Sequence, residues 1–113
     1  DPVQHALPQA IRTSPDEWQA EVIYVDRFGN LITSLWGDDL TGDPGGWVFD
    51  VAGQTIASLH CTYADVAPGA LLALVGSDGR VEIAAREGSA ASILGIRQHA
   101  VVVARRDMPH HTL

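Results

Sequence analysis

The chain has 113 residues, of which 46% are hydrophobic, and this length fits one domain with a modest core. Its formal charge is −7 and all seven basic residues are arginines, so we expect no basic face for nucleic acid. No apolar stretch approaches the roughly 18 to 20 residues of a membrane span, and no secretory leader is recognised. With a single cysteine, Cys61, an internal disulfide is excluded, so a reducing, cytoplasmic location is expected.

The first residues differ in pattern from the rest of the chain. Residues 1–19 show little periodicity and carry four loop markers, namely Pro2, Pro8, Ser14 and Pro15. They are predicted to form an interdomain linker or an extended arm. Residues 20–106 read as short strands separated by turn signals. Residues 107–113, which include two adjacent histidines, are predicted to be a flexible tail.

The strands are predicted in chain order. "EVIYVD" and "LITSLW" flank a turn at residues 26–30, "GWVFDVAGQTIASLH" is a hairpin turning at Ala52–Gly53, and "ALLALVG" and "RVEIAA" form another hairpin. "HAVVVAR" is the last strand, and "EGSAASILG" is the single predicted helix, capped by Ser89 and stopped by Gly95. This pattern predicts an all-β fold: a mainly antiparallel β-barrel or sandwich-like domain with one short helix.

Several candidate catalytic or metal sites have simpler explanations. The serine of "GSDG" lacks the spacing of a nucleophile elbow, and a hairpin turn explains it better. The acidic stretch "DDLTGDPGG" does not match a calcium loop. His60 and Cys61 are adjacent in a predicted strand, so their side chains point to opposite faces. No catalytic group and no metal site is therefore predicted in this chain.

The turn in "YVDRFGNLITSL" is harder to explain by structure alone. Gly29 and Asn30 suit a turn because both tolerate a left-handed backbone. A simple turn would leave Phe28 partly exposed, where its ring can stack on a flat heterocycle while the Asn30 amide pairs with the edge of adenine. Asp26 can accept a hydrogen bond from an ammonium or a ribose hydroxyl. These residues support a ligand site and a structural turn about equally.

Two motifs in this order resemble a known family. "VDRFGNLITSL" and "TYADVAPGALLALVGSDGRVEIAAREGSAASILG" resemble the C-terminal domain of the S-adenosylmethionine (SAM) hydroxide adenosyltransferases, relatives of the fluorinase and chlorinase. The resemblance extends from about residue 21 to residue 103. It implies a β-barrel-like domain that follows a larger α/β domain, in subunits that form homotrimers. SAM, the substrate, would lie between this domain and the N-terminal domain of a neighbouring subunit.

The resemblance also implies a reaction and roles for residues. Water or hydroxide attacks the ribose C5′ of SAM and releases L-methionine and adenosine, and no metal or cofactor is required. By resemblance, Asn30 reads the adenine edge, Phe28 and Tyr63 line the adenine pocket, and Asp26 holds the methionine ammonium. Glu87 lies where the family uses main-chain groups against adenine, so its side chain has no assigned role.

At the other motif, Ser77 matches the serine that binds the methionine carboxylate. The next residue, Asp78, is arginine in the fluorinase, and an acid there would repel the carboxylate. That contact would then be made by the backbone or not at all, and Arg80 is close enough to compensate. The fluorinase turn has one more residue between its acid and its aromatic residue, so this chain is nearer to the hydroxide-using branch.

The family's N-terminal α/β domain, which carries the catalytic residues, has no counterpart in this sequence. We therefore expect this fragment alone to be inactive, while the complete protein would be a SAM hydrolase. Two alternatives remain at this point. The domain can be a non-catalytic module that binds a nucleoside or a protein, or it can belong to a SAM-dependent halogenase.

Overall fold

The computed structural model describes residues 9–60, 65–96 and 99–106. The elements of this part are β1 (Ile11–Ser14), β2 (Glu17–Val25), β3 (Leu31–Trp36), the 3-10 helices η1 (Gly37–Asp39) and η2 (Pro44–Gly46), β4 (Trp47–Val51), β5 (Gln54–Ala57), β6 (Leu59–His60), β7 (Leu71–Val75), β8 (Arg80–Ala85), α1 (Ala90–Leu94) and β9 (Val101–Arg106). The fold is all-β with one short α-helix, as the sequence predicts.

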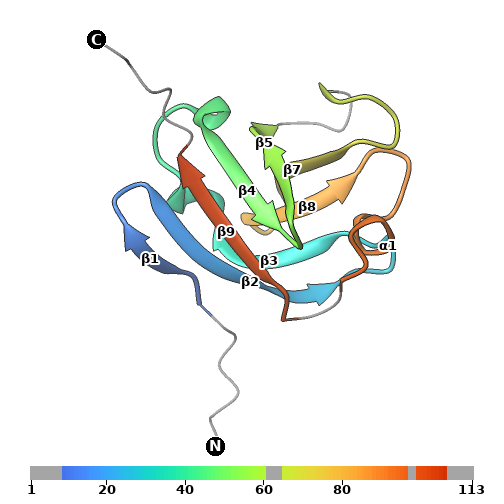
Figure 1. Cartoon of the computed structure of the whole chain (residues 1–113), viewed down its shortest axis with the longest axis horizontal. Helices are drawn as coiled ribbons and strands as arrows, with labels where there is room; N and C mark the ends of the chain where they lie inside the picture. The colour runs from blue at the N-terminus through green and yellow to red at the C-terminus, as the bar shows by residue number, and fades with distance from the viewer. Residues whose placement is uncertain (1–8, 61–64, 97–98, 107–113) are drawn as a thin grey trace, which may run out of the picture.

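The strands form a strongly curved sheet that nearly closes into a barrel (Figure 1). Their order is β5-β4-β9-β2-β3-β8-β7-β6, with β1 paired to β2 outside this path. Pairing is antiparallel throughout, except that β6 and β7 run parallel. β5 from one end of this order contacts β7 near the other end, which brings the two ends of the sheet together.

Alternate residues of the strands fill the interior, because successive side chains of a strand point to opposite faces. The largest fully buried side chains are Trp47 and Phe49 of β4 and Leu31 and Leu35 of β3. The Trp47 indole Nε1 donates to the Thr41 carbonyl at 2.9 Å, so its polar atom is satisfied. These residues hold the strands around a single main core.

The sheet begins earlier than we predicted. β1 and the first residues of β2 lie within residues 11–19, which the sequence patterns assign to a linker or extended arm. The loop markers Ser14 and Pro15 belong to the tight turn of a β1–β2 hairpin. Gln19 pairs with Ile11 of β1 and with Val103 of β9, so this segment is held in the sheet from both sides.

The predicted turns and the predicted helix are confirmed. Ala52 and Gly53 have φ values of 52° and 80° at the β4–β5 turn. The Ser89 hydroxyl accepts from the Ser92 amide at 3.2 Å at the start of α1, and Gly95 ends the helix with φ 66°. In the described part of the chain, no helix has the length and apolar character needed to cross a membrane.

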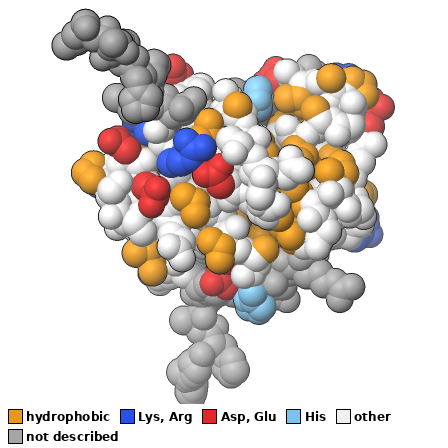
Figure 2. Space-filling model, viewed as in Figure 1, with side chains coloured by type: hydrophobic (Ala, Val, Ile, Leu, Met, Phe, Trp, Pro, Cys, Tyr) orange, Lys and Arg blue, Asp and Glu red, His pale blue; other side chains and the backbone are white. Residues whose placement is uncertain are grey.

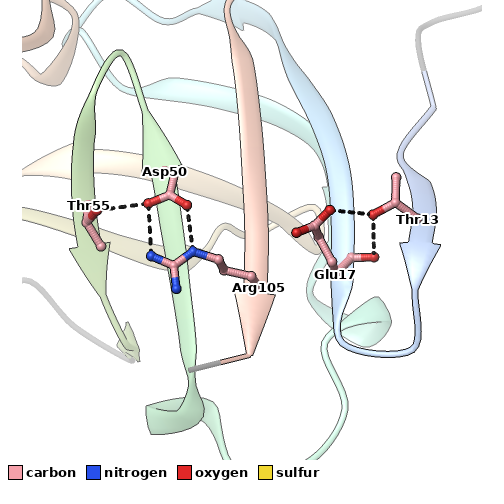
Figure 3. Close-up of polar contacts among 5 residues, drawn as sticks. All are labelled: Thr13, Glu17, Asp50, Thr55 and Arg105. Atoms are coloured by element: carbon pink, nitrogen blue, oxygen red, sulfur yellow. Dashed lines mark hydrogen bonds and ion pairs between the residues drawn. The ribbon is translucent and has the colours of Figure 1, made fainter. Parts of the chain in front are cut away.

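The outer face of β4 and β9 carries paired charges. Arg105 contacts Asp50 at 2.7 Å and 3.4 Å, and Thr55 donates to the same carboxylate at 2.9 Å (Figure 3). The hydrogen bond from Arg105 lowers the pKa of Asp50 below its ordinary value. Acidic and basic side chains accordingly lie next to one another on this face (Figure 2). This network stabilises the sheet and lies apart from the site described next.

Candidate functional site

Asp26 organises the turn between β2 and β3. Its Oδ1 accepts from the backbone amides of Phe28 and Asn30 at 2.9 Å and 3.0 Å, and its Oδ2 accepts from Asn30 Nδ2 at 3.1 Å. The backbone amide of Asp26 donates to the Asn30 carbonyl at 3.0 Å. The sequence patterns point to a ligand for this carboxylate, but they do not predict its place at the centre of the turn.

The same turn is held against α1. The Gly29 carbonyl accepts from the Ala91 amide at 2.9 Å, in the first turn of the helix. Gly29 has φ 84°, and a Cβ atom there would lie 1.9 Å from the Ser89 hydroxyl oxygen. Glycine is therefore required twice, for its backbone conformation and for this close contact.

A cavity of about 400 Å³ opens beside the turn. It is lined by Phe28, Asn30, Ala85, Arg86, Glu87 and Gly88. Phe28 is 66% exposed, whereas Asn30 is only 9% exposed, so the ring stands in solvent and the amide lies at depth. Three of the predicted site residues, Phe28, Asn30 and Glu87, are thus brought together around one cavity.

Arg86 also lines the cavity, and sequence reasoning missed it. Its guanidinium donates to the Val66 carbonyl at 2.7 Å, and its Nε lies 3.8 Å from a Glu87 carboxylate oxygen. Glu87 has φ 58°, a left-handed value that is uncommon for a residue with a side chain. In the sequence, the glycine at position 88 is the signal that predicts a turn next to Arg86 and Glu87.

Ser77, Asp78 and Arg80 lie elsewhere, in the β7–β8 turn and at the start of β8. The cavity residues begin at the far end of β8, and a six-residue strand spans roughly 17 Å between its end residues. Asp78 lines a separate groove of about 520 Å³, whose residues are Trp36, Gly37, Asp38, Asp39, Val75, Asp78 and Gly79. The predicted site therefore consists of two groups at opposite ends of β8.

Arg80 is engaged at this second group. Its guanidinium carbon lies 4.1 Å from the centre of the Trp36 ring, a cation–π contact. Its Nε lies 3.8 Å from the Asp78 carboxylate, and its backbone amide donates to Asp78 at 3.1 Å. Arg80 thus offsets the charge of Asp78. Ser77 and Asp78 are both exposed.

Glu82 lies in β8 between the two groups, and sequence reasoning missed it as well. It pairs with Ile32 of β3 and Leu74 of β7, and a Cβ atom at Gly76 would lie 1.8 Å from its carboxylate. Burial raises the pKa of Glu82, and the negative charges of Asp78 and Asp26 raise it further. The signal in the sequence is the one acidic residue of "RVEIAA", which stands between the apolar residues Val81 and Ile83.

The remaining predicted residue, Tyr63, lies outside the described residues, as does Cys61. His60 is described, and its Nδ1 lies 3.6 Å from Asp65. Within residues 9–60, 65–96 and 99–106, no group of three or more His, Cys, Asp or Glu side chains is arranged to hold a metal ion. The cavity beside the turn is lined by the Phe28 ring and the Asn30 amide, a combination suited to a flat polar heterocycle.

Residues 20–103 match the sequence profile of the SAM hydroxide adenosyltransferase C-terminal domain. The chain belongs to this family. The SAM hydroxide adenosyltransferase match includes both motifs that carried the resemblance, so the predicted family is confirmed. Two relatives named (R)-S-adenosyl-L-methionine hydrolase support it. The one from Thermus thermophilus is 38% identical over 92 residues, and the one from Salinispora tropica is 40% identical over 86 residues.

The matches cover most of this chain but only part of each relative. They span 81% and 76% of this chain and 32% of each hydrolase, so the chain corresponds to about a third of their length. A conserved hypothetical protein from Thermus thermophilus has a similar structure, with a TM-score of 0.68 and 34% identity over 92% of this chain and 40% of that one. An uncharacterized conserved protein from Thermotoga maritima has the same fold, with a TM-score of 0.74 and 23% identity over 94% of this chain and 41% of that one.

Proposed function

We propose that this chain is the C-terminal domain of an adenosine-forming SAM hydrolase and supplies the adenine- and methionine-binding side of its active site. The observation that carries the proposal is the meeting of an exposed Phe28 ring and a buried Asn30 amide at one cavity. The two relatives named (R)-S-adenosyl-L-methionine hydrolase support SAM as the substrate. Catalytic residues would come from the N-terminal α/β domain of a neighbouring subunit in a homotrimer.

Adenine would bind in the cavity beside the β2–β3 turn. Stacking of a base on an aromatic side chain is worth about 1 to 3 kcal/mol, and the ring of Phe28 is free enough in solvent to provide it. The Asn30 amide would pair with the edge of the base, and Tyr63 would complete the pocket. Glu87 would contribute through its main chain, because its carboxylate is turned toward Arg86.

The methionine part would extend from this cavity toward the β7–β8 turn. An ionised carboxylate has about four acceptor positions, and Asp26 uses three for N–H groups of its own turn. One position is left for the methionine ammonium, whose positive charge the nearby Glu82 also favours. Ser77 would meet the methionine carboxylate through its hydroxyl or backbone, with Arg80 nearby to balance Asp78.

The reaction itself would depend on positioning and on exclusion of bulk water. Water or hydroxide would form a bond to C5′ while the C5′–sulfur bond breaks and methionine leaves with the electron pair; when water attacks, its extra proton is released to the solvent. Such a displacement gains its rate from a near-attack geometry in a closed site. We place the reaction in the cytoplasm. The protein would bind SAM there and would need neither a membrane nor a nucleic acid as a partner.

The test is to incubate the full-length protein with SAM and to measure adenosine and methionine. Equal amounts of both products would support the hydrolase. A second incubation with added chloride or fluoride would reveal a halogenase through a 5′-halo-deoxyadenosine. A folded protein that binds adenosine but forms no product with any of these nucleophiles would instead support the non-catalytic nucleoside-binding module.

A further inference from the structure

We propose that Asp26 is a positioning residue that sets base specificity: it holds the Asn30 amide so that the site accepts a 6-aminopurine and rejects a 6-oxopurine. This inference rests on the proposed function, because it assumes that a purine enters the cavity lined by Phe28 and Asn30. Asp26 would act through Asn30, in addition to any contact that it makes with the methionine ammonium.

An asparagine amide can normally turn over to suit its partner. Its oxygen accepts and its nitrogen donates, and the two ends have nearly the same shape. An unrestrained amide would therefore meet either a 6-amino or a 6-oxo group, by presenting its oxygen to the first and its nitrogen to the second. Discrimination requires that something fix which end faces the ligand.

Asp26 does this by its chemistry. Its Oδ2 lies 3.1 Å from the Asn30 side-chain nitrogen. An ionised carboxylate can only accept hydrogen bonds, so the nitrogen, and not the oxygen, has to face it. Turning the amide over would place two acceptors at hydrogen-bond distance and leave both without a donor.

The rest of the turn prevents Asp26 itself from turning away. Its other oxygen accepts from the backbone amides of Phe28 and Asn30 at 2.9 Å and 3.0 Å. Asn30 is 9% exposed and therefore has little room for another rotamer. The acid, the amide and the backbone thus form one closed set of hydrogen bonds within five residues.

The Asn30 oxygen is left for the ligand. Among the residues that the structure describes, none donates a hydrogen bond to this oxygen, although the side chain is nine-tenths buried and lines the cavity. Buried amide oxygens are rarely left without a donor. A 6-amino group supplies one, whereas a 6-oxo group would bring a second acceptor against it.

The fixed amide can be observed directly in this chain, because Asn30 is its only asparagine. Selective ¹⁵N labelling of asparagine gives one side-chain NH₂ group in the NMR spectrum of the wild type. Asp26→Asn and Asp43→Asn each add a second group, so in the variants the Asn30 group is assigned through its connection to the Asn30 backbone amide. We expect the Asn30 side-chain protons to exchange with water at least ten times faster in Asp26→Asn than in the wild type. Asp43→Asn is the matched control, because Asp43 also accepts a backbone amide, from Gly45 at 3.0 Å, but does not line the cavity.

Specificity is tested in the full-length protein by the ratio of dissociation constants for inosine and adenosine. Nucleosides lack the methionine part, so the ammonium contact of Asp26 does not enter. We expect the wild type and Asp43→Asn to prefer adenosine, and we expect Asp26→Asn to reduce that preference at least tenfold. Asparagine keeps the size of Asp26 and can still accept through its oxygen, but it can also donate to Asn30.

The outcomes separate the two proposals. An unchanged ratio in a folded Asp26→Asn variant, or unchanged proton exchange, would overturn the role of Asp26 and leave the proposed function standing. A loss of affinity for both nucleosides by the same factor would also overturn it, because that result indicates a purely structural role. A wild-type protein that binds neither nucleoside would overturn the proposed function and this inference with it.

Discussion

Gly29 and Ser89 touch where the β2–β3 turn meets the start of α1. A Cβ atom at Gly29 would lie 1.9 Å from the Ser89 hydroxyl oxygen and 2.6 Å from its Cβ. The same helix start donates the Ala91 amide to the Gly29 carbonyl at 2.9 Å. The helix therefore fixes the position of the two side chains, Phe28 and Asn30, that line the cavity beside the turn.

Gly29→Ala should destabilise the domain by about 2 to 4 kcal/mol, because it adds a steric overlap to the strain of a left-handed backbone. Gly53→Ala is the matched control. Gly53 has a similar φ of 80°, but nothing lies within 4 Å of a Cβ there, so only the backbone strain applies. Urea unfolding of both variants measures the difference, and equal losses would show that the Ser89 contact has no cost.

Phe28→Ala should leave the free energy of unfolding within about 0.5 kcal/mol of the wild type, as expected for an exposed side chain. In the full-length protein it should weaken SAM binding by about 1 to 3 kcal/mol through the lost stacking. Phe28→Tyr keeps the ring and should restore most of the affinity. A Phe28→Ala protein with unchanged affinity would place adenine elsewhere.

Asn30→Ala should weaken SAM binding in the full-length protein by about 1 to 3 kcal/mol, because the base loses its partner at the amide. The measurement is the Michaelis constant, checked against direct adenosine binding. Gln19→Ala is a suitable control, since it removes an exposed amide that does not line the cavity. An unchanged Michaelis constant in a folded Asn30→Ala variant would refute the assignment.

Glu82 should make the domain less stable as the pH rises. Its pKa in the folded state is raised above 4.5, so the folded state holds this proton more tightly than the unfolded state does. The free energy of unfolding then falls as the pH rises from about 4.5 through the raised value. Glu82→Gln cannot titrate, so its stability relative to the wild type should be greater at pH 7 than at pH 4.

Chemical denaturation at both pH values measures this change. Glu17→Gln serves as the control for replacing a carboxylate by an amide on another strand. If the difference between Glu82→Gln and the wild type were the same at pH 4 and pH 7, burial and the nearby charges of Asp78 and Asp26 would not act on Glu82 as described.

Local features of the fold were predictable because each depends on a few neighbouring residues. The β4–β5 turn follows from Ala52–Gly53, and the ends of α1 follow from Ser89 and Gly95. The β1–β2 hairpin was not predicted, because Ser14 and Pro15 indicate a loop equally well, whereas in the structure they lie where the chain turns between two paired strands. The pairing of Gln19 with Val103 of β9 joins distant parts of the sequence, and residue types alone do not predict it.

The site divides in the same way. The types and spacing of Phe28 and Asn30 were enough to predict a ligand site as one of two readings, and both side chains line the cavity. The places of Arg86 and Glu82 in the site were not predictable in this way. They depend on how β8 pairs with β3 and β7, which joins residues that are far apart in the sequence. The hydrogen bonds of Asp26 depend on backbone geometry that residue types alone do not specify.

The most direct test of the proposed hydrolase is to incubate the full-length protein with SAM in water enriched in ¹⁸O. We predict that adenosine and methionine form in equal amounts and that adenosine carries one ¹⁸O atom in its 5′-hydroxyl, because water or hydroxide displaces methionine at C5′. The absence of adenosine, or adenosine without ¹⁸O, from a folded protein would contradict this account.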